Sequence, residues 1–247
     1  MKTVGVLGIG EVGSAIKKLA SKNFTVYTRD LDHDNFKGKE INVLHLCVPY
    51  NSKFTSIAIK TIKELKPKLI IINSTVKPGT TRKIYQKTKV PIAHVPIMGI
   101  HPHLAKYQKT FTKMIGPVND QSYQLARTHW RKLGTTKIIR FNGPEETELG
   151  KILSTTYYGW NIIFNKAAKK ICQQTNTNFN QVYTKFNQIY NSGYLKTKPN
   201  VVRPVLDYTP GKIGGHCVIP NAEIMKSSPE QIFKWLLKFN QALANED

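Results

Sequence analysis

The sequence is poor in cysteine and in acidic residues, and it contains no long apolar run. Its three cysteines, Cys47, Cys172 and Cys217, stand at unrelated spacings that form neither a disulfide framework nor a zinc site. No stretch approaches the ~20 apolar residues that span a bilayer. The first apolar run follows a single lysine, which leaves no room for a signal peptide. We therefore expect a cytoplasmic protein with no membrane partner.

The scarcity of acidic residues leaves a strong positive charge, because 15 Asp and Glu stand against 37 Lys and Arg, a formal net charge of +22. Such an excess favours anionic partners. The lysines are spread along the whole chain beside abundant Asn and Ile, as biased codon usage alone would produce, and no lysine run interleaved with aromatics marks a nucleic-acid groove. We expect a small anionic substrate and do not favour nucleic acid as the partner.

The beginning of the chain carries the pattern around which the rest is organised. Residues 4–7 read as a strand, Gly8-x-Gly10-x-x-Gly13 follows directly, and residues 14–20 have helical periodicity. Gly8 permits a tight turn, Gly10 lets a pyrophosphate approach the backbone, and Gly13 lets the helix pack on the strand. The pattern predicts a Rossmann domain whose first helix points its amino end at the phosphates.

A second strand, residues 24–28, ends at Arg29 and Asp30, and Asp30 lies twenty-two positions beyond Gly8. An acidic side chain there accepts hydrogen bonds from the adenosine ribose and repels a 2′-phosphate. We therefore expect NAD rather than NADP as the cofactor, although Arg29 could attract a 2′-phosphate.

Further apolar strands alternate with helical segments up to residue 143, which predicts an α/β fold with a doubly wound parallel sheet and an NAD-binding domain over residues 1–143. We expect Thr80 or Thr81 to cap a helix and Gly116-Pro117 to form a turn. The expected strands are 41–48, 68–73, 91–95, 110–115 and 137–141, and the expected helices are 54–65, one starting at 80 or 81 and ending near 87, and 121–133.

A long helix, residues 145–173, should lead into a small helical domain over residues 144–247 that serves dimerisation and substrate binding. Apolar residues recur on this helix every three or four positions from Leu149 to Ile171. One such stripe exposes more apolar surface than a soluble monomer tolerates, so we expect a homodimer. Lys151 points away from the stripe and is either solvated or turned to the cofactor cleft. Helices are also expected over 180–190 and 229–243, with a loop-rich segment between them.

Two loops carry candidate functional residues. Thr75 follows an apolar strand, and ligands of open α/β sheets bind at the carboxyl ends of strands. His94, His101 and His103 cluster in sequence, but no Cys, Asp or Glu lies close by to complete a metal site, so we expect no metal and one useful histidine.

Cys217 is the candidate nucleophile. Glycines precede it and let the backbone approach a ligand, and His216 and Lys212 could lower the pKa of its thiol. Cys47, inside an apolar strand, and Cys172, inside the long helix, are expected to be inert fillers. The alternative for Cys217 is an incidental thiol in a flexible loop.

These motifs together resemble the UDP-glucose/GDP-mannose dehydrogenase family over residues 1 to about 225. The matching stretches are Gly8-Ile-Gly-Glu-Val-Gly13, Cys47-Val-Pro49, Ser74-Thr-Val-Lys-Pro-Gly-Thr-Thr81, Glu148-Leu-Gly-Lys151 and Pro210-Gly-Lys-Ile-Gly-Gly-His-Cys217. The resemblance implies that two NAD molecules oxidise the primary alcohol of a nucleotide sugar to the acid. It implies Cys217 as the nucleophile that forms a thiohemiacetal and then a thioester, Lys151 as the cation that stabilises oxyanions, and Thr75 as the holder of the catalytic water.

The expected contacts follow from these motifs. We assign the cofactor to Gly8, Gly10, Glu11, Val12, Gly13, Asp30, Val48, Pro49 and Thr75, and the substrate to Thr155, Gly214, Gly215, His216 and Asn221.

The chain also departs from the family's pattern. The family's Pro-Glu motif is Pro96-Ile-Met-Gly-Ile-His-Pro here, its asparagine is Thr155 and its aspartate is Asn221. We expect no counterpart of its carboxyl-terminal sugar-nucleotide domain within residues 1–247. His101 is the candidate replacement for the acid-base group, in a His-Pro context slightly similar to that of prephenate dehydrogenases. Two alternatives stay open: a dehydrogenase-like protein that binds a polyanion or nucleic acid without turnover, and a hydroxyacid dehydrogenase.

Overall fold

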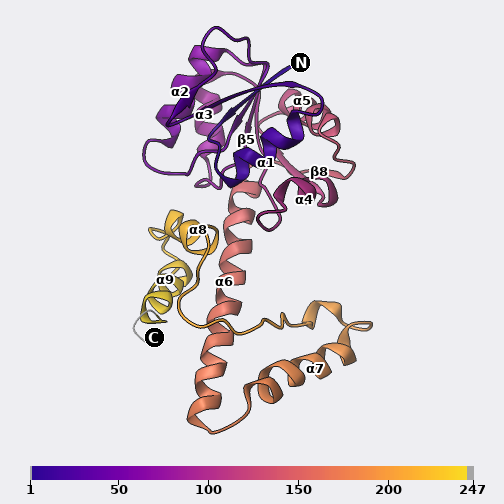
Figure 1. The fold of residues 1–247 in the computed structure, drawn as a ribbon, viewed down its shortest axis with the longest axis vertical. Coiled ribbons are helices and arrows are strands. Elements are labelled where there is room, and N and C mark those ends of the chain that lie inside the picture. The colour runs from indigo at the N-terminus through magenta and orange to yellow at the C-terminus, as the bar shows by residue number, and fades with distance from the viewer. Residues whose placement is uncertain (1, 244–247) are drawn as a thin grey trace. The chain divides into compact units, whose positions relative to one another are not determined.

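The structure is a computed structural model that describes residues 2–243. The chain divides into two compact units, Met1–Lys151 and Ile152–Asp247. The first unit holds a sheet covered by helices, and the second is helical (Figure 1).

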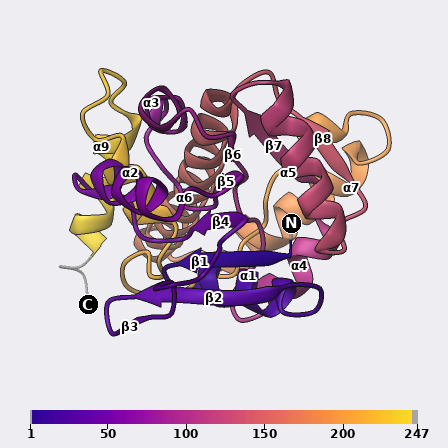
Figure 2. The same ribbon diagram turned by 90° about the horizontal axis from the view of Figure 1, so that it is seen from above.

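The sheet of the first unit has eight strands in the described part of the chain, in the order β3-β2-β1-β4-β5-β6-β7-β8 (Figure 2). Neighbours are parallel except for the pairs β2–β3 and β6–β7. Strand order reverses beside β1, which is the topological switch point where such sheets bind dinucleotides. The strands are β1 Thr3–Leu7, β2 Thr25–Asp30, β3 His33–Asp34, β4 Val43–Leu46, β5 Leu69–Ile72, β6 Ile92–His94, β7 Lys113–Pro117 and β8 Ile138–Arg140.

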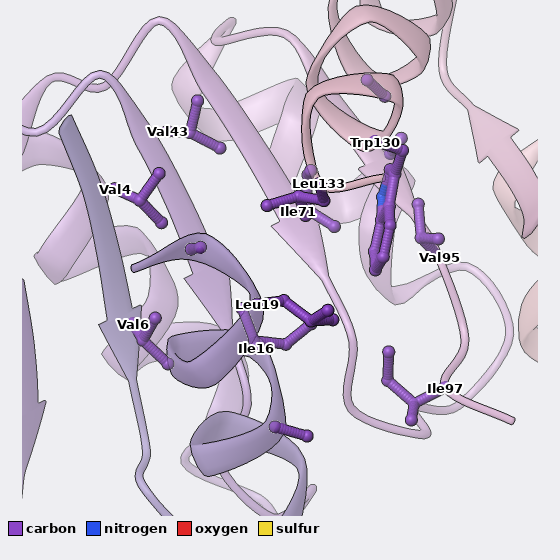
Figure 3. Close-up of a cluster of buried hydrophobic side chains, with 14 of the residues drawn as sticks. Val4, Val6, Ile16, Leu19, Val43, Ile71, Val95, Ile97, Trp130 and Leu133 are labelled. Atoms are coloured by element: carbon purple, nitrogen blue, oxygen red, sulfur yellow. The ribbon is translucent and has the colours of Figure 1, made fainter. Parts of the chain in front are cut away.

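Helices cover both faces of this sheet, which confirms the predicted doubly wound Rossmann-type fold. One apolar cluster joins Ile16, Leu19 and Trp130 to inward residues of the strands, as the close-up in Figure 3 shows. A second cluster on the opposite face contains Phe54 and Ile62. Strands β4 and β5 are buried along their whole length because both faces are covered. The helices are α1 Glu11–Ala20, α2 Phe54–Leu65, α3 Thr80–Thr88, α4 Leu104–Thr110 and α5 Asp120–Lys132.

The predicted turn at Gly116-Pro117 is wrong, because both residues belong to β7 and pair with β6. A Cβ on Gly116 would lie 2.3 Å from Thr147 Oγ1, so the glycine is there for close packing rather than for a turn. The proline is tolerated because it sits at the end of its strand. Helix α4 was not predicted: it lies between the loop that carries His101 and His103 and the strand expected at 110–115, which in the structure begins only at Lys113.

The second unit contains most of α6, Pro144–Gln174, which confirms the predicted long helix. The expected helix at 180–190 is a π-helical turn, η1 Asn180–Lys185, continued by α7 Phe186–Tyr194. After the short η2, Pro199–Val201, and a loop-rich segment come α8 Val218–Ile224, which the sequence did not predict, and α9 Ile232–Ala242.

Two small apolar clusters hold this unit together. Val218, Ala222 and Leu236 pack against Trp160 of α6. Farther along α6, Cys172 packs with Phe179 and Tyr183. Within residues 2–243 no helix combines the length and the apolar character that crossing a membrane requires.

Candidate active site

The glycine turn between β1 and α1 has the geometry that the sequence predicts. Gly8 has φ +89°, and a Cβ on Gly13 would lie 1.8 Å from the Gly8 carbonyl oxygen, so the helix can approach the strand only with glycine there. A Cβ added to Gly10 would have no atom within 4 Å, so the space through which a pyrophosphate would approach the backbone is open. Helix α1 starts at Glu11 without a side-chain cap on its first N–H groups.

Asp30 lies at the end of β2 and holds this turn. One of its carboxylate oxygens accepts from the backbone N–H of Ile9 at 2.5 Å and the other from that of Leu31 at 2.7 Å. These bonds lower the pKa of Asp30, chiefly the one from Ile9, so the group is a carboxylate beside the glycine turn.

Arg29 faces a different set of partners. Its guanidinium donates to both oxygens of Glu64 at 2.9 and 2.5 Å, lies 2.8 Å from Asp34, and stacks 4.7 Å from the centre of the Phe36 ring. These carboxylates raise the pKa of Arg29 against the opposing effect of burial. The arginine is therefore engaged within the protein and not poised for a 2′-phosphate.

A cavity of about 390 Å³ opens beside the glycine turn. Its lining includes Gly10, Glu11 and Ser14 from the turn and α1, and His101 and Pro102 from the loop before α4. The structure thus brings His101 next to the predicted cofactor loop. His103 does not line this cavity, and the described residues contain no group of three or more His, Cys, Asp or Glu that could hold a metal ion.

The carboxyl ends of β4 and β5 meet at the same edge of the sheet as the glycine turn, because Leu46 is in register with both Leu7 and Ile72. The Ser74 hydroxyl donates to the Val48 carbonyl at 2.6 Å and so ties the segment before Pro49 to the one that carries Thr75. Thr75 itself is half-buried.

Glu148 on α6 holds the loop that follows Thr75. Its carboxylate accepts from the backbone N–H of Gly79 at 2.6 Å, and from the backbone N–H and hydroxyl of Thr81 at 2.8 and 2.6 Å. Burial raises the pKa of Glu148, and the bonds that it accepts act in the opposite direction. The prediction that Thr80 or Thr81 caps α3 is wrong: both are already in the helix, and the cap comes from a carboxylate 67 residues away.

Lys151 lies one turn beyond Glu148, and its ammonium donates to the Ile97 carbonyl at 2.9 Å and lies 3.9 Å from the Met98 sulfur. Lys151 is therefore held on the segment that follows β6, which favours the second of the two expected alternatives, a lysine turned to the cofactor cleft, over a solvated lysine.

Four buried polar residues near this edge were given no role by the sequence reasoning, which noted His94 only as one of three clustered histidines. Lys113 is 1% exposed, its ammonium lies 4.6 Å from the Trp130 ring centre, and burial, with a smaller effect from Lys151, lowers its pKa to about 7. His94 lies between the Thr147 hydroxyl at 2.8 Å and the Ser74 carbonyl at 3.2 Å, and burial lowers its pKa to about 3. His45 and Asn73 share a 2.6 Å hydrogen bond. No local pattern marks such residues; only their place in strands that are otherwise apolar hints at them.

The second unit carries the other predicted residues. Cys217 is exposed at the start of α8, and Gly214 and Gly215, the latter with φ +78°, have open space around them. The Asn221 amide donates to Thr155 Oγ1 at 3.1 Å, so these two predicted substrate residues lie together. As predicted, Cys172 is buried. Burial also raises the pKa of Cys47, which makes that thiol unreactive.

Comparison with known proteins finds that the chain is similar to dehydrogenases. No family model matches it. It is 29% identical over 168 residues to UDP-N-acetyl-D-mannosamine dehydrogenase of Methanocaldococcus jannaschii, which covers 64% of this chain and 36% of the relative. The corresponding protein of Pyrococcus horikoshii is 22% identical over 218 residues, 81% of this chain and 49% of the relative.

The chain resembles nucleotide-sugar dehydrogenases. This similarity confirms the resemblance that was inferred from the motifs. The chain spans about a third of the length of the first relative, at 36%. The structure of UDP-D-ManNAc dehydrogenase from Pyrococcus horikoshii aligns with a TM-score of 0.79 at 20% identity, over 98% of this chain and 68% of that one. Mycobacterium tuberculosis 3-hydroxyisobutyrate dehydrogenase aligns with a TM-score of 0.70 at 13% identity, over 100% and 94%. At these identities the structural likenesses show only that the chain shares the fold of these proteins.

Proposed function

We propose that the protein is an NAD-dependent dehydrogenase that oxidises the primary alcohol of a nucleotide sugar, with a UDP-N-acetylhexosamine as the first candidate. The observation that carries the proposal is the gathering of the glycine turn, the Thr75 segment and the Lys151 ammonium at one edge of the sheet. The similarity to UDP-N-acetyl-D-mannosamine dehydrogenases supports the substrate class. Residues 1–143 would bind the cofactor, and residues 144–247 would serve substrate binding and assembly.

NAD fits the residues of the first unit. The open space at Gly10 and the uncapped start of α1 suit a pyrophosphate, with Glu11, Val12 and Gly13 in the same turn. The Asp30 carboxylate would accept from the ribose hydroxyls and repel a 2′-phosphate, and Arg29 is engaged by Glu64 and Asp34. Val48, Pro49 and Thr75, at the ends of the neighbouring strands, would flank the nicotinamide half.

The chemistry divides among a few side chains. NAD, held by the glycine turn and Asp30, would supply the hydride acceptor, with one NAD molecule needed for each of the two successive oxidations. The Lys151 ammonium, held by the Ile97 carbonyl, would stabilise the alkoxide that forms as the alcohol loses its proton, and His101 is the candidate acceptor of that proton. The Cys217 thiolate would then add to the aldehyde carbon, which gives a thiohemiacetal whose oxidation leaves a thioester. Attack by a water held by Thr75 releases the acid and restores the thiol.

The protein would act as a homodimer in a reducing cytoplasm, in keeping with its free cysteines. Support for the dimer comes from the α6 stripe, in which large apolar side chains remain exposed: Leu149, Leu153, Tyr157, Phe164 and Ile171. Gly214, Gly215 and His216 beside Cys217, together with Thr155 and Asn221, are the proposed substrate contacts.

NADH formation with UDP-N-acetyl-D-mannosamine, UDP-glucose and 3-hydroxyisobutyrate tests the proposal. We expect turnover with a nucleotide sugar. NAD should be preferred over NADP by about tenfold or more, since a buried or unpaired charge costs ~1–3 kcal/mol. Lys151→Ala should abolish activity, whereas Lys106→Ala, on the exposed face of α4, should retain it. Turnover of the hydroxyacid alone would assign the protein to the other dehydrogenase class. Absence of turnover with all three would favour the binding-protein alternative.

A further inference from the structure

Arg29 and Asp30 are neighbours at the end of β2, but their side chains have different surroundings. Successive side chains of a strand point to opposite faces of the sheet. Asp30 holds the glycine turn through the backbone N–H of Ile9, whereas the Arg29 guanidinium lies over the ring of Phe36, on the face that α2 covers. Because consecutive Cα atoms are about 3.8 Å apart, Arg29 starts one residue from the place where the adenosine ribose of NAD would bind.

Two carboxylates from other elements hold this guanidinium. Both oxygens of Glu64, which lies 35 residues along the chain on α2, accept from it at 2.9 and 2.5 Å, and Asp34 of β3 lies 2.8 Å from its Nε atom. The bond with Arg29 is the main cause that lowers the pKa of each carboxylate, so both are ionised at neutral pH. The Arg29 side chain is 17% exposed, and both of its terminal nitrogens donate to Glu64.

Arg29 is also the one strong cation of its stretch of sequence. No other Lys or Arg occurs in residues 23–36, whereas Asp30, Asp32 and Asp34 all fall there. A guanidinium binds a phosphate through two parallel hydrogen bonds, and the 2′-phosphate is the group by which NADP differs from NAD. Acceptance of NADP at the end of β2 would therefore depend on whether Arg29 is released to turn toward the ribose.

We propose that Glu64 and Asp34 are specificity-determining residues, which select NAD by holding Arg29 away from the position of a 2′-phosphate. The Asp30 carboxylate supplies repulsion at that position, and the clamp formed by Glu64 and Asp34 withholds the attraction that would offset it. This role rests on the proposed NAD site, to which it adds two residues that do not touch the cofactor. A clamp with a purely structural role would stabilise the fold or change both affinities together, but it would not set their ratio.

Calorimetric titration of the full chain with NAD and with NADP, without a sugar substrate, tests the clamp, because it measures binding and not turnover. Asp34→Asn/Glu64→Ala releases the guanidinium: asparagine keeps an acceptor for the Phe36 backbone N–H, and alanine preserves the helix propensity of α2. The Kd of NADP divided by that of NAD should fall by at least about tenfold, the effect of one charge-assisted hydrogen bond to the phosphate. The affinity for NAD should change by no more than about twofold, which also shows that the variant is folded.

Two controls separate the guanidinium from a general effect of charge. Adding Arg29→Ala to the double variant keeps both carboxylates removed but deletes the guanidinium, and it should return the ratio to within about threefold of the wild type. Glu145→Ala breaks another bidentate arginine pair of the same unit, with Arg82 at 2.5 and 2.9 Å, and should leave the ratio unchanged.

The possible failures can be told apart. An unchanged ratio in Asp34→Asn/Glu64→Ala, or an equal fall when Arg29→Ala is added, would overturn the clamp and leave NAD as the cofactor. A wild-type chain that binds neither nucleotide would overturn the proposed cofactor, and the clamp with it.

Discussion

The Asn221 side-chain amide donates to Thr155 Oγ1 at 3.1 Å, and this bond joins two of the positions where the chain departs from the pattern of the family that it resembles. The Thr155 hydroxyl in turn donates to the Ile152 carbonyl at 2.9 Å. An amide and a hydroxyl thus occupy positions where the family has an aspartate and an asparagine. Neither is a general base that could deprotonate water, so release of the acid from Cys217 should be slow.

Asn221→Asp should therefore accelerate acid formation. The new carboxylate would accept from the Thr155 hydroxyl once that hydroxyl turns away from the Ile152 carbonyl, and it could activate water; a positioned general base contributes ~10²–10⁴ in rate. We expect at least about a tenfold rise in single-turnover acid release. Asn178→Asp is the control, because it makes the same charge change at an exposed position where the Asn178 side chain accepts from the Gln181 backbone N–H and aspartate can replace it. An unchanged rate in Asn221→Asp would show that this position does not govern hydrolysis.

Glu148 should be required for stability of the first unit. Glu148→Ala leaves two backbone N–H groups and the Thr81 hydroxyl without their acceptor in a buried place, which should cost about 2–4 kcal/mol of unfolding free energy. Glu145→Ala removes a carboxylate from the same helix turn, but its partner Arg82 is exposed and the expected loss is about 0–1 kcal/mol. Urea unfolding of both variants measures the difference, and equal losses would contradict the assigned role of Glu148.

Acid should destabilise the protein through its buried histidines. The pKa of His94 is lowered to about 3, so between pH 6.5 and 3 the unfolded chain binds a proton that the folded chain does not. The stability that His94 contributes is present above pH 6.5 and is lost as the pH falls, by about 1.4 kcal/mol per pH unit.

His94→Gln isolates this effect, because glutamine can keep the bonds to Thr147 and Ser74 without titrating. Between pH 6 and 4 the slope of its unfolding free energy against pH should be smaller than that of the wild type, by the amount that corresponds to about one bound proton. Parallel curves for wild type and His94→Gln would be evidence against a neutral buried His94.

The exposed stripe of α6 should pair two subunits. Phe164→Glu places a charge at the 66% exposed ring position, and burying that charge in a dimer interface costs several kcal/mol. We expect a dimeric mass for the wild type by light scattering at micromolar concentration and a monomeric mass for the variant. Ile139→Glu changes a 56% exposed residue of β8 in the other unit and should leave the dimer intact. A monomeric wild type would rule out this interface.

Much of the fold could be predicted because it is encoded locally. The helix at Phe54–Leu65 has the predicted bounds, and the strand at Leu69–Ile72 reads as an unbroken apolar run. The strands at 92–94 and 138–140 were found for the same reason, as was the long helix that starts at Pro144. The glycine turn was predictable because each glycine meets a specific steric requirement. Asp30 was predictable from its position at the end of the second strand, twenty-two residues beyond Gly8.

What could not be predicted depends on distant residues. Glu148 caps α3 from another helix, so the capping role predicted for the threonines at the start of α3 was wrong although it was locally plausible. Gly116 and Pro117 look like a turn, yet β6 pairs with them and Thr147 packs on the glycine. The burial of the charged Lys113 side chain could not be predicted, because its partners Gln108 and Trp130 come to lie beside it only when the chain folds.

The central claim is that Cys217 carries the oxidised sugar, and mass spectrometry of the intact protein tests it most directly. After incubation with NAD and UDP-N-acetyl-D-mannosamine, the wild-type chain should show a covalent sugar-nucleotide adduct, because hydrolysis lacks a complete water-activating set. Cys217→Ser should show no adduct and at most the alcohol-to-aldehyde step, whereas Cys172→Ser, at the buried thiol of α6, should keep the adduct. Undiminished acid formation by Cys217→Ser, or an adduct that persists in that variant, would contradict the account.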